Sequence, residues 1–145
     1  MLPPFDERGD LPAGVHVSSW EEIQQRLGSD TPKRVRLMGT LRHLHALAAQ
    51  TAHLSRFIIF GSFVTHTPEP RDVDVVVIMA EGFRLEDAPR ESQTLFSHAE
   101  ADARFGASVF WIREGILPAA EVAAFLGFWQ TRRDGEKRGI VEVRS

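Results

Sequence analysis

The chain has no cysteine among its 145 residues, which excludes disulfide bonds and metal sites built on thiolates. It has no apolar run long enough to cross a bilayer, and residues 1–4 lack the features of a secretory signal. The net charge is only −3, so a broad basic surface for non-specific binding of nucleic acid is not expected. These absences predict a soluble, cytoplasmic protein with no membrane partner.

The chain also lacks internal repeats, low-complexity segments and any linker that would divide it. Its length fits one domain, and an apolar fraction of 43% is ordinary for a globular protein. We therefore expect a single domain over residues 1–145. Prolines and glycines are frequent in residues 1–17, which are predicted to be irregular and docked on the body. The excess of arginine over lysine, with frequent alanine, indicates a GC-rich bacterial genome.

The most informative stretch contains two short apolar runs joined by a turn-rich segment. Residues 56–60 and 75–79 are rich in β-branched and aromatic side chains, which is typical of buried strands. Gly61-Ser62 ends the first run, and Asp72-Val73-Asp74 opens the second. Because side chains alternate along a strand, the two aspartates are expected to point the same way, about 7 Å apart.

This pattern of residues points to phosphate and metal chemistry. Two carboxylates so close repel each other unless a cation or strong donors lie between them, and Mg²⁺ prefers such oxygen ligands. Gly61 would let the backbone approach a phosphate, and Ser62 would offer a hydroxyl and an N–H. A helix beginning just after them would add anion donors. The alternative is that Gly61-Ser62 is a plain turn and the aspartate pair a solvated strand start.

The arrangement resembles the nucleotidyltransferase fold of the DNA polymerase β superfamily, whose signature is Gly-Ser, a short spacer, and Asp-x-Asp opening a hydrophobic strand. In this chain nine residues separate Ser62 from Asp72. The chain is most similar to the minimal nucleotidyltransferases, small prokaryotic proteins often found in toxin–antitoxin pairs. Residues 2–22 and 128–141 also resemble an uncharacterised bacterial group of nucleotidyltransferase-like proteins, which extends the resemblance over most of the chain.

The resemblance implies a role for each of the four residues. Asp72 and Asp74 would be catalytic and would bind one or two Mg²⁺, while Gly61 and Ser62 would bind the phosphates of an NTP, ATP in the first instance. An acceptor hydroxyl would attack the α-phosphate and release pyrophosphate. The acceptor is either a hydroxyl of a partner protein, as in the antitoxins of this type, or an RNA 3′ end, as in the related toxins.

Active members of the superfamily usually carry a third carboxylate on the strand beside the aspartate pair. Residues 107–112 are predicted to form that strand, and Ser108 stands where the acid is expected. Asp102 before the strand and Glu114 after it are the nearest acids. The missing acid leaves a second function open, in which a weak or inactive enzyme acts as a binding partner or antitoxin.

The rest of the pattern predicts an α/β (α+β) architecture with a mixed, mostly antiparallel sheet of about four strands and helices on one face. Apolar residues at helical spacing predict helices over residues 18–27, 32–52, 91–105 and 118–130, and residues 140–143 alternate like a final edge strand. The aspartate pair would lie in an open groove on the other face. The edge strand could pair with a second copy, so a homo-oligomer is also open.

Basic side chains of the second helix, Arg34 among them, lie mostly off its apolar stripe. We expect them on a solvated face, and the alternative is that they approach a triphosphate or an acidic partner. Residues 132–138 form a charged turn that contains an Asp-Gly pair.

Overall fold

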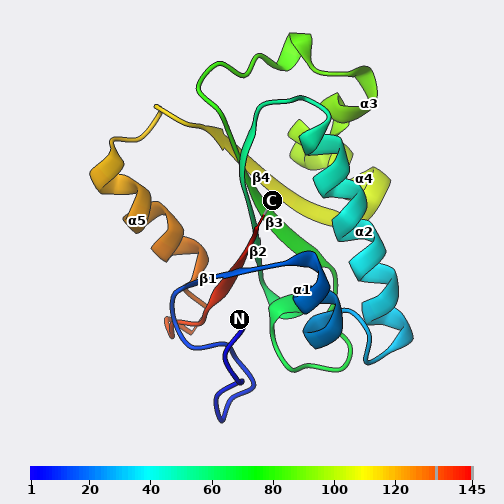
Figure 1. Ribbon diagram of the computed structural model, residues 1–145, viewed down its shortest axis with the longest axis vertical. Helices are drawn as coiled ribbons and strands as arrows, with labels where there is room; N and C mark the ends of the chain where they lie inside the picture. The colour runs from blue at the N-terminus through cyan, green and yellow to red at the C-terminus, as the bar shows by residue number, and fades with distance from the viewer. Residues whose placement is uncertain (133, 145) are drawn as a thin grey trace.

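The structure, a computed structural model, describes residues 1–132 and 134–144 and contains one five-stranded sheet (Figure 1). The strand order is β1-β5-β2-β3-β4. The strands are β1 (Val15–Ser18), β2 (Leu54–Phe60), β3 (Val73–Met79), β4 (Ala107–Arg113) and β5 (Ile140–Val143). β2 is antiparallel to both of its neighbours, whereas β1 runs parallel to β5 and β3 parallel to β4. The α/β prediction is confirmed, but the sheet has five strands rather than four, and only half of its pairings are antiparallel.

The additional strand is β1, which begins at Val15 inside the segment expected to be irregular to residue 17. Val15 pairs with Ile140 at the opposite end of the chain, so no local sequence pattern indicates this pairing. On its other side, β5 is hydrogen-bonded to β2. The prediction of a C-terminal edge strand is therefore wrong, and β5 offers no free edge to a second copy.

Helices lie on both faces of the sheet, which corrects the prediction of helices on one face only (Figure 1). One face carries α1 (Trp20–Leu27), α2 (Pro32–Ala49), α3 (Arg90–Gln93) and α4 (His98–Phe105). The other face carries α5 (Ala119–Trp129), whose Leu126 is buried against the sheet. None of the described helices is long and apolar enough to span a membrane.

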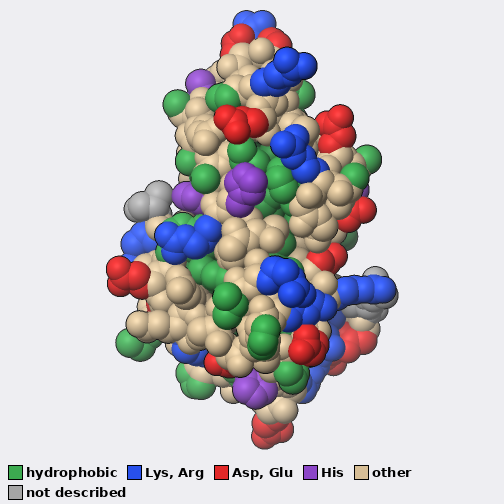
Figure 2. All heavy atoms as spheres, turned by 90° about the vertical axis from the view of Figure 1, so that its right-hand side faces the viewer, with side chains coloured by type: hydrophobic (Ala, Val, Ile, Leu, Met, Phe, Trp, Pro, Cys, Tyr) green, Lys and Arg blue, Asp and Glu red, His purple; other side chains and the backbone are tan. Residues whose placement is uncertain are grey.

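The alternation of β3 shows which face each side chain of the sheet occupies. Val73, Val75 and Val77 are buried in the core under α1 to α4, whereas Val76 and Ile78 belong to the smaller cluster under α5. Asp74 has the same parity as Val76, so its side chain lies on the α5 side of the sheet. Figure 2 shows the side of the molecule that carries α2. Basic and acidic side chains are interspersed on it, in keeping with the low net charge.

Side-chain caps mark the beginnings of α1, α2 and α4. Ser19 accepts a hydrogen bond from the backbone N–H of Glu22, so α1 begins at Trp20 rather than at residue 18. Thr31 accepts one from the backbone N–H of Arg34 at the start of α2, which confirms the predicted start at residue 32. The helix expected over residues 91–105 is interrupted at Ser97, which instead caps α4. α2 ends at Ala49, before the predicted residue 52, because Ala52 has a φ of 62° that a right-handed helix cannot contain.

Candidate active site

The residues singled out from the sequence meet at one end of the sheet, on the face that α5 covers. Asp74 is paired with Phe60 of β2 on one side and with Ser108 of β4 on the other. Gly61 and Ser62 follow Phe60 directly, and Asp72 immediately precedes β3. All four predicted residues, together with Ser108, line one cavity of about 910 Å³.

Gly61 is the residue that lets the two parts of the motif approach each other. Its φ of 80° and ψ of −161° lie in a region that residues with a side chain rarely adopt. A Cβ on Gly61 would overlap Oδ2 of Asp74 and would lie 3.0 Å from its Cγ. The close approach of this backbone to the Asp74 carboxylate therefore requires glycine.

Ser62 begins a single 3₁₀ turn, Ser62–Val64, rather than a longer helix. Its hydroxyl accepts a 3.4 Å hydrogen bond from the backbone N–H of Arg71, and its carbonyl accepts one of 2.7 Å from the Thr65 hydroxyl. This turn is too short to supply the N-terminal donors of a helix, but it leaves the side chain and backbone of Ser62 on the cavity wall.

Both aspartates have raised pKa values. Burial raises the pKa of Asp74 to about 6 and the charge of Asp72 adds to the rise, while a hydrogen bond from Ser108 and the charge of Arg138 oppose it. Burial also raises the pKa of Asp72, and Asp102 adds to that effect. The neighbouring cations thus do not fully compensate for the burial and mutual repulsion of the two carboxylates. A cation bound between them would supply the additional positive charge.

Within the described part of the chain, no third carboxylate joins the pair. Ser108 lies opposite Asp74, at the position where the acid was expected. Asp102 acts on Asp72 through its charge, but the described residues contain no group of three His, Cys, Asp or Glu side chains that could hold a metal ion. Two carboxylates suit Mg²⁺ in particular, because Mg²⁺ keeps several water ligands and completes its shell with substrate phosphates.

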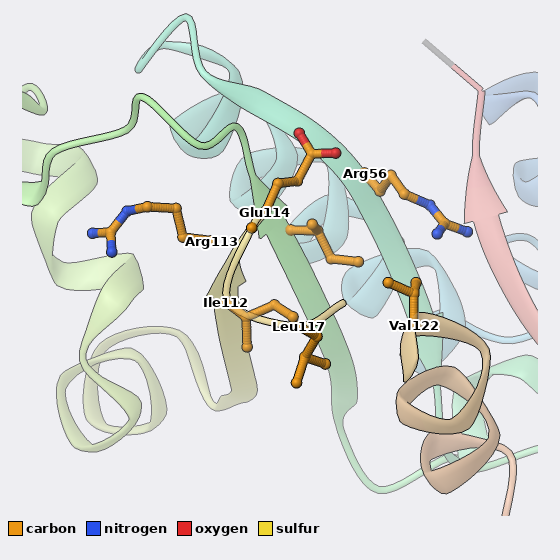
Figure 3. A pocket seen from close by; sticks show the side chains of 8 residues that line it. Arg56, Ile112, Arg113, Glu114, Leu117 and Val122 are labelled. Atoms are coloured by element: carbon orange, nitrogen blue, oxygen red, sulfur yellow. The ribbon is translucent and has the colours of Figure 1, made fainter. Parts of the chain in front are cut away.

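Glu114 lies at the opposite end of β4. Its backbone N–H donates to the carbonyl of Met79, the last residue of β3, and it lines a separate hollow of about 220 Å³. Figure 3 shows Ile112 and Leu117 lining this hollow, with the side chain of Arg56 extended toward β5. Glu114 therefore cannot complete a site at Asp74.

Several residues of the cavity were not predicted as site residues. They are four aromatic residues, called here the aromatic wall (Phe60, Phe110, Phe128 and Trp129), three arginines (Arg71, Arg132 and Arg138) and Thr131. The Trp129 ring lies 4.7 Å from the rings of both Phe60 and Phe110, measured between centroids. Strand parity could have indicated Phe110, which is two residues beyond Ser108, but no local pattern connects Trp129 or the charged turn to the aspartates.

Arg34 is buried, which corrects the prediction of a solvated side chain. Its guanidinium donates hydrogen bonds of 2.6 to 3.1 Å to four backbone carbonyls, those of Leu27, Phe63, Thr65 and Thr67. Three of these carbonyls belong to the segment that follows Gly61-Ser62. Arg34 therefore holds the loop of the candidate site in place from behind and does not line the cavity.

Comparison with known proteins adds a family but no activity. No curated protein and no solved structure matches the chain. Residues 3–144 match a family whose description is "Family of unknown function (DUF6932)". Because the match spans nearly the whole sequence, the chain belongs to this family of unknown function, DUF6932.

Proposed function

We propose that this protein is a metal-dependent nucleotidyltransferase that transfers an NMP from an NTP to a hydroxyl of a protein or an RNA. The observation that carries the proposal is the convergence of Gly61, Ser62, Asp72 and Asp74 on one cavity. The contact between the Gly61 backbone and the Asp74 carboxylate supports it, because a plain turn beside a solvated strand start would not need that approach.

The lining of the cavity matches the three parts of an NTP bound with Mg²⁺. Asp72 and Asp74 provide oxygen ligands, Arg132 and Arg138 provide charged donors for phosphate oxygens, and the aromatic wall provides a surface on which a base can stack. Phe128 is 68% exposed, so its ring is available to a ligand without repacking of the core.

In this proposal Asp72 and Asp74 would hold Mg²⁺, which when bound neutralises charge on the phosphates. The backbone and hydroxyl of Ser62 would donate to the phosphate oxygens and fix the α-phosphate for in-line attack. The acceptor oxygen bonds to the α-phosphorus as the bond to pyrophosphate breaks. Among the described residues, only Asp72 and Asp74 are acids that line the cavity, so the hydroxyl proton passes to one of them or to water.

A second candidate function is favoured by Ser108. A hydroxyl opposite Asp74 cannot replace a carboxylate as a metal ligand or base of the same strength. The protein would then bind a nucleotide with little or no transfer and act through a partner, for example as the antitoxin of a toxin–antitoxin pair.

Isothermal titration calorimetry with ATP, CTP, GTP and UTP tests the proposal, with and without Mg²⁺. We expect Mg²⁺-dependent binding by the wild type that Asp72→Asn and Asp74→Asn each weaken at least tenfold. Glu114→Gln is the matched control, because it neutralises an acid at the opposite end of the same sheet. Binding that survives both aspartate substitutions, or is absent from the wild type, would contradict the proposal, and binding without transfer to any acceptor favours the second function.

A further inference from the structure

The charged turn, of which the structure describes residues 131–132 and 134–138, lies beside the candidate site. Thr131 forms a bridge with Lys137, and the backbone N–H of Arg138 donates a 2.8 Å hydrogen bond to the carbonyl of Gln130. These contacts bring the side chains of Arg132 and Arg138 to the wall of the cavity that contains Asp72 and Asp74.

The same two arginines also line a second hollow of about 530 Å³, and so does Ser62. The aromatic residues of the first cavity do not line the second one, which is bordered by polar groups such as Glu7, Arg8 and His66. A base stacked on the aromatic wall would therefore place its phosphates toward Ser62, with the last of them between Arg132 and Arg138.

Asp10, whose side chain is 3% exposed, lies beside these arginines and also lines the second hollow. Its Oδ2 accepts a 2.5 Å hydrogen bond from Nη1 of Arg132, and its Oδ1 lies 3.9 Å from Nη1 of Arg138. The backbone of Asp10 is fixed by a bridge to Thr65 and by a 3.0 Å hydrogen bond from its N–H to Oδ1 of Asp6. One buried carboxylate thus positions two guanidinium groups and balances only one of their charges.

Of the two guanidinium groups, that of Arg138 is the less closely paired with Asp10. Arg132 has Asp134 as a further partner, at 3.9 Å, and Arg8, the third arginine near Asp10, pairs with Glu136 at 3.3 Å. The guanidinium of Arg138 donates no hydrogen bond to any described residue, although its side chain is only 21% exposed. A half-buried guanidinium with unused donors at a cavity wall is suited to an anion with several oxygens.

We infer that Arg138 and Arg132 bind the terminal phosphates of the nucleotide, and that Asp10 is the positioning residue that holds both guanidinium groups toward the cavity. This inference rests on the proposed function. It means that the charged turn lets the protein distinguish a nucleoside triphosphate from a monophosphate. Without the charge of Asp10, the two guanidinium groups would repel each other and would no longer be held at the cavity wall.

The test is the ratio of ATP to AMP affinity, measured by calorimetry with Mg²⁺. We expect Arg138→Gln to weaken ATP binding about ten- to a hundredfold while AMP binding changes less than threefold, since a charge-assisted hydrogen bond to phosphate is lost. Asp10→Asn should reduce the ratio in the same direction, and Arg138→Lys should restore part of it. Arg84→Gln is the control, because Arg84 is exposed and lines neither hollow.

The ratio separates this role from a structural one, because a loss of folding would weaken ATP and AMP binding alike. An unchanged ratio in Arg138→Gln, or equal losses for both nucleotides, would overturn the inference and leave the proposed function standing. Failure of the wild type to bind ATP at all would overturn both.

Discussion

The carboxylate of Asp74 lies directly against the backbone of Gly61, with no space between them for a Cβ atom. This contact joins the turn after β2 to the start of β3 and explains why the glycine and the aspartate occur together. It also makes the geometry of the site sensitive to a single methyl group.

Gly61→Ala should therefore disturb the site more than the small size of the added methyl group suggests. The new Cβ overlaps Asp74 and the φ of 80° is unfavourable for alanine, so we expect a loss of about 1–3 kcal/mol in the free energy of unfolding. Chemical denaturation measures this loss, and calorimetry should show weaker binding of ATP with Mg²⁺. Gly82→Ala is the control, because a Cβ there meets no atom within 4 Å; equal effects at both glycines would contradict the account.

Arg34→Met should destabilise the protein without touching the cavity. The substitution keeps an apolar stem but leaves the carbonyls of Phe63, Thr65 and Thr67 without their donor, at a cost of about 2–4 kcal/mol. Thermal unfolding should show a clearly lowered Tm, compared with Arg36→Met on the exposed side of the same helix. A Tm as high as that of Arg36→Met would mean that the Arg34 contacts do not hold the loop.

Asp74 gives the metal-free protein a specific dependence on pH. Burial raises the pKa of Asp74 from 3.8 to about 6, so the folded protein binds this proton more tightly than the unfolded chain. The resulting stabilisation is fully present below pH 3.8 and is lost as the pH rises through 6, with a total of at most about 3 kcal/mol.

Asp74→Asn should remove this dependence. The difference in unfolding free energy between variant and wild type should grow in favour of the variant from about pH 4 to pH 7. Acids away from the aspartate pair, such as Glu22, whose pKa is lowered by hydrogen bonds from Ser18 and Leu2, contribute equally to both proteins and cancel. A constant difference across this range would show that the Asp74 carboxyl titrates at its ordinary pKa.

Ser108→Asp would place a carboxylate opposite Asp74, where the third acid was expected. We expect the variant to be less stable than wild type without metal by about 1 kcal/mol, since like charges repel, and to bind Mg²⁺ about tenfold more tightly. Calorimetric titration with Mg²⁺ alone measures the gain, with Ser108→Asn as the uncharged control. If Ser108→Asp binds Mg²⁺ no better than Ser108→Asn, residue 108 does not face the metal position.

The part of the fold that local chemistry dictates was predictable from the sequence. Strands β2, β3 and β4 follow from their apolar runs, and the caps Ser19 and Thr31 begin helices where their hydroxyls can reach backbone N–H groups. The convergence of Gly61 and Asp74 also followed from residue type and spacing, because two adjacent antiparallel strands bring the end of one beside the start of the next.

What the sequence did not indicate depends on contacts between distant segments. β1 is a strand because β5, from the other end of the chain, pairs with it, and α5 covers the second face because that face also has apolar residues to bury. From its position in the helix Arg34 is expected at the surface, but in the structure its guanidinium is surrounded by carbonyls of the loop. The ion pair of Asp10 with Arg132 could not be predicted either, because neither residue stands in an unusual local sequence pattern.

Crystallography of the protein with Mn²⁺ and a non-hydrolysable ATP analogue would test the central claim most directly. Mn²⁺ replaces Mg²⁺ on oxygen ligands and can be located by its anomalous scattering. The account predicts an anomalous peak bound by Asp72 and Asp74, with the triphosphate running past Ser62 to Arg138. A metal and nucleotide bound away from this cavity, or no occupancy at saturating concentrations, would contradict it.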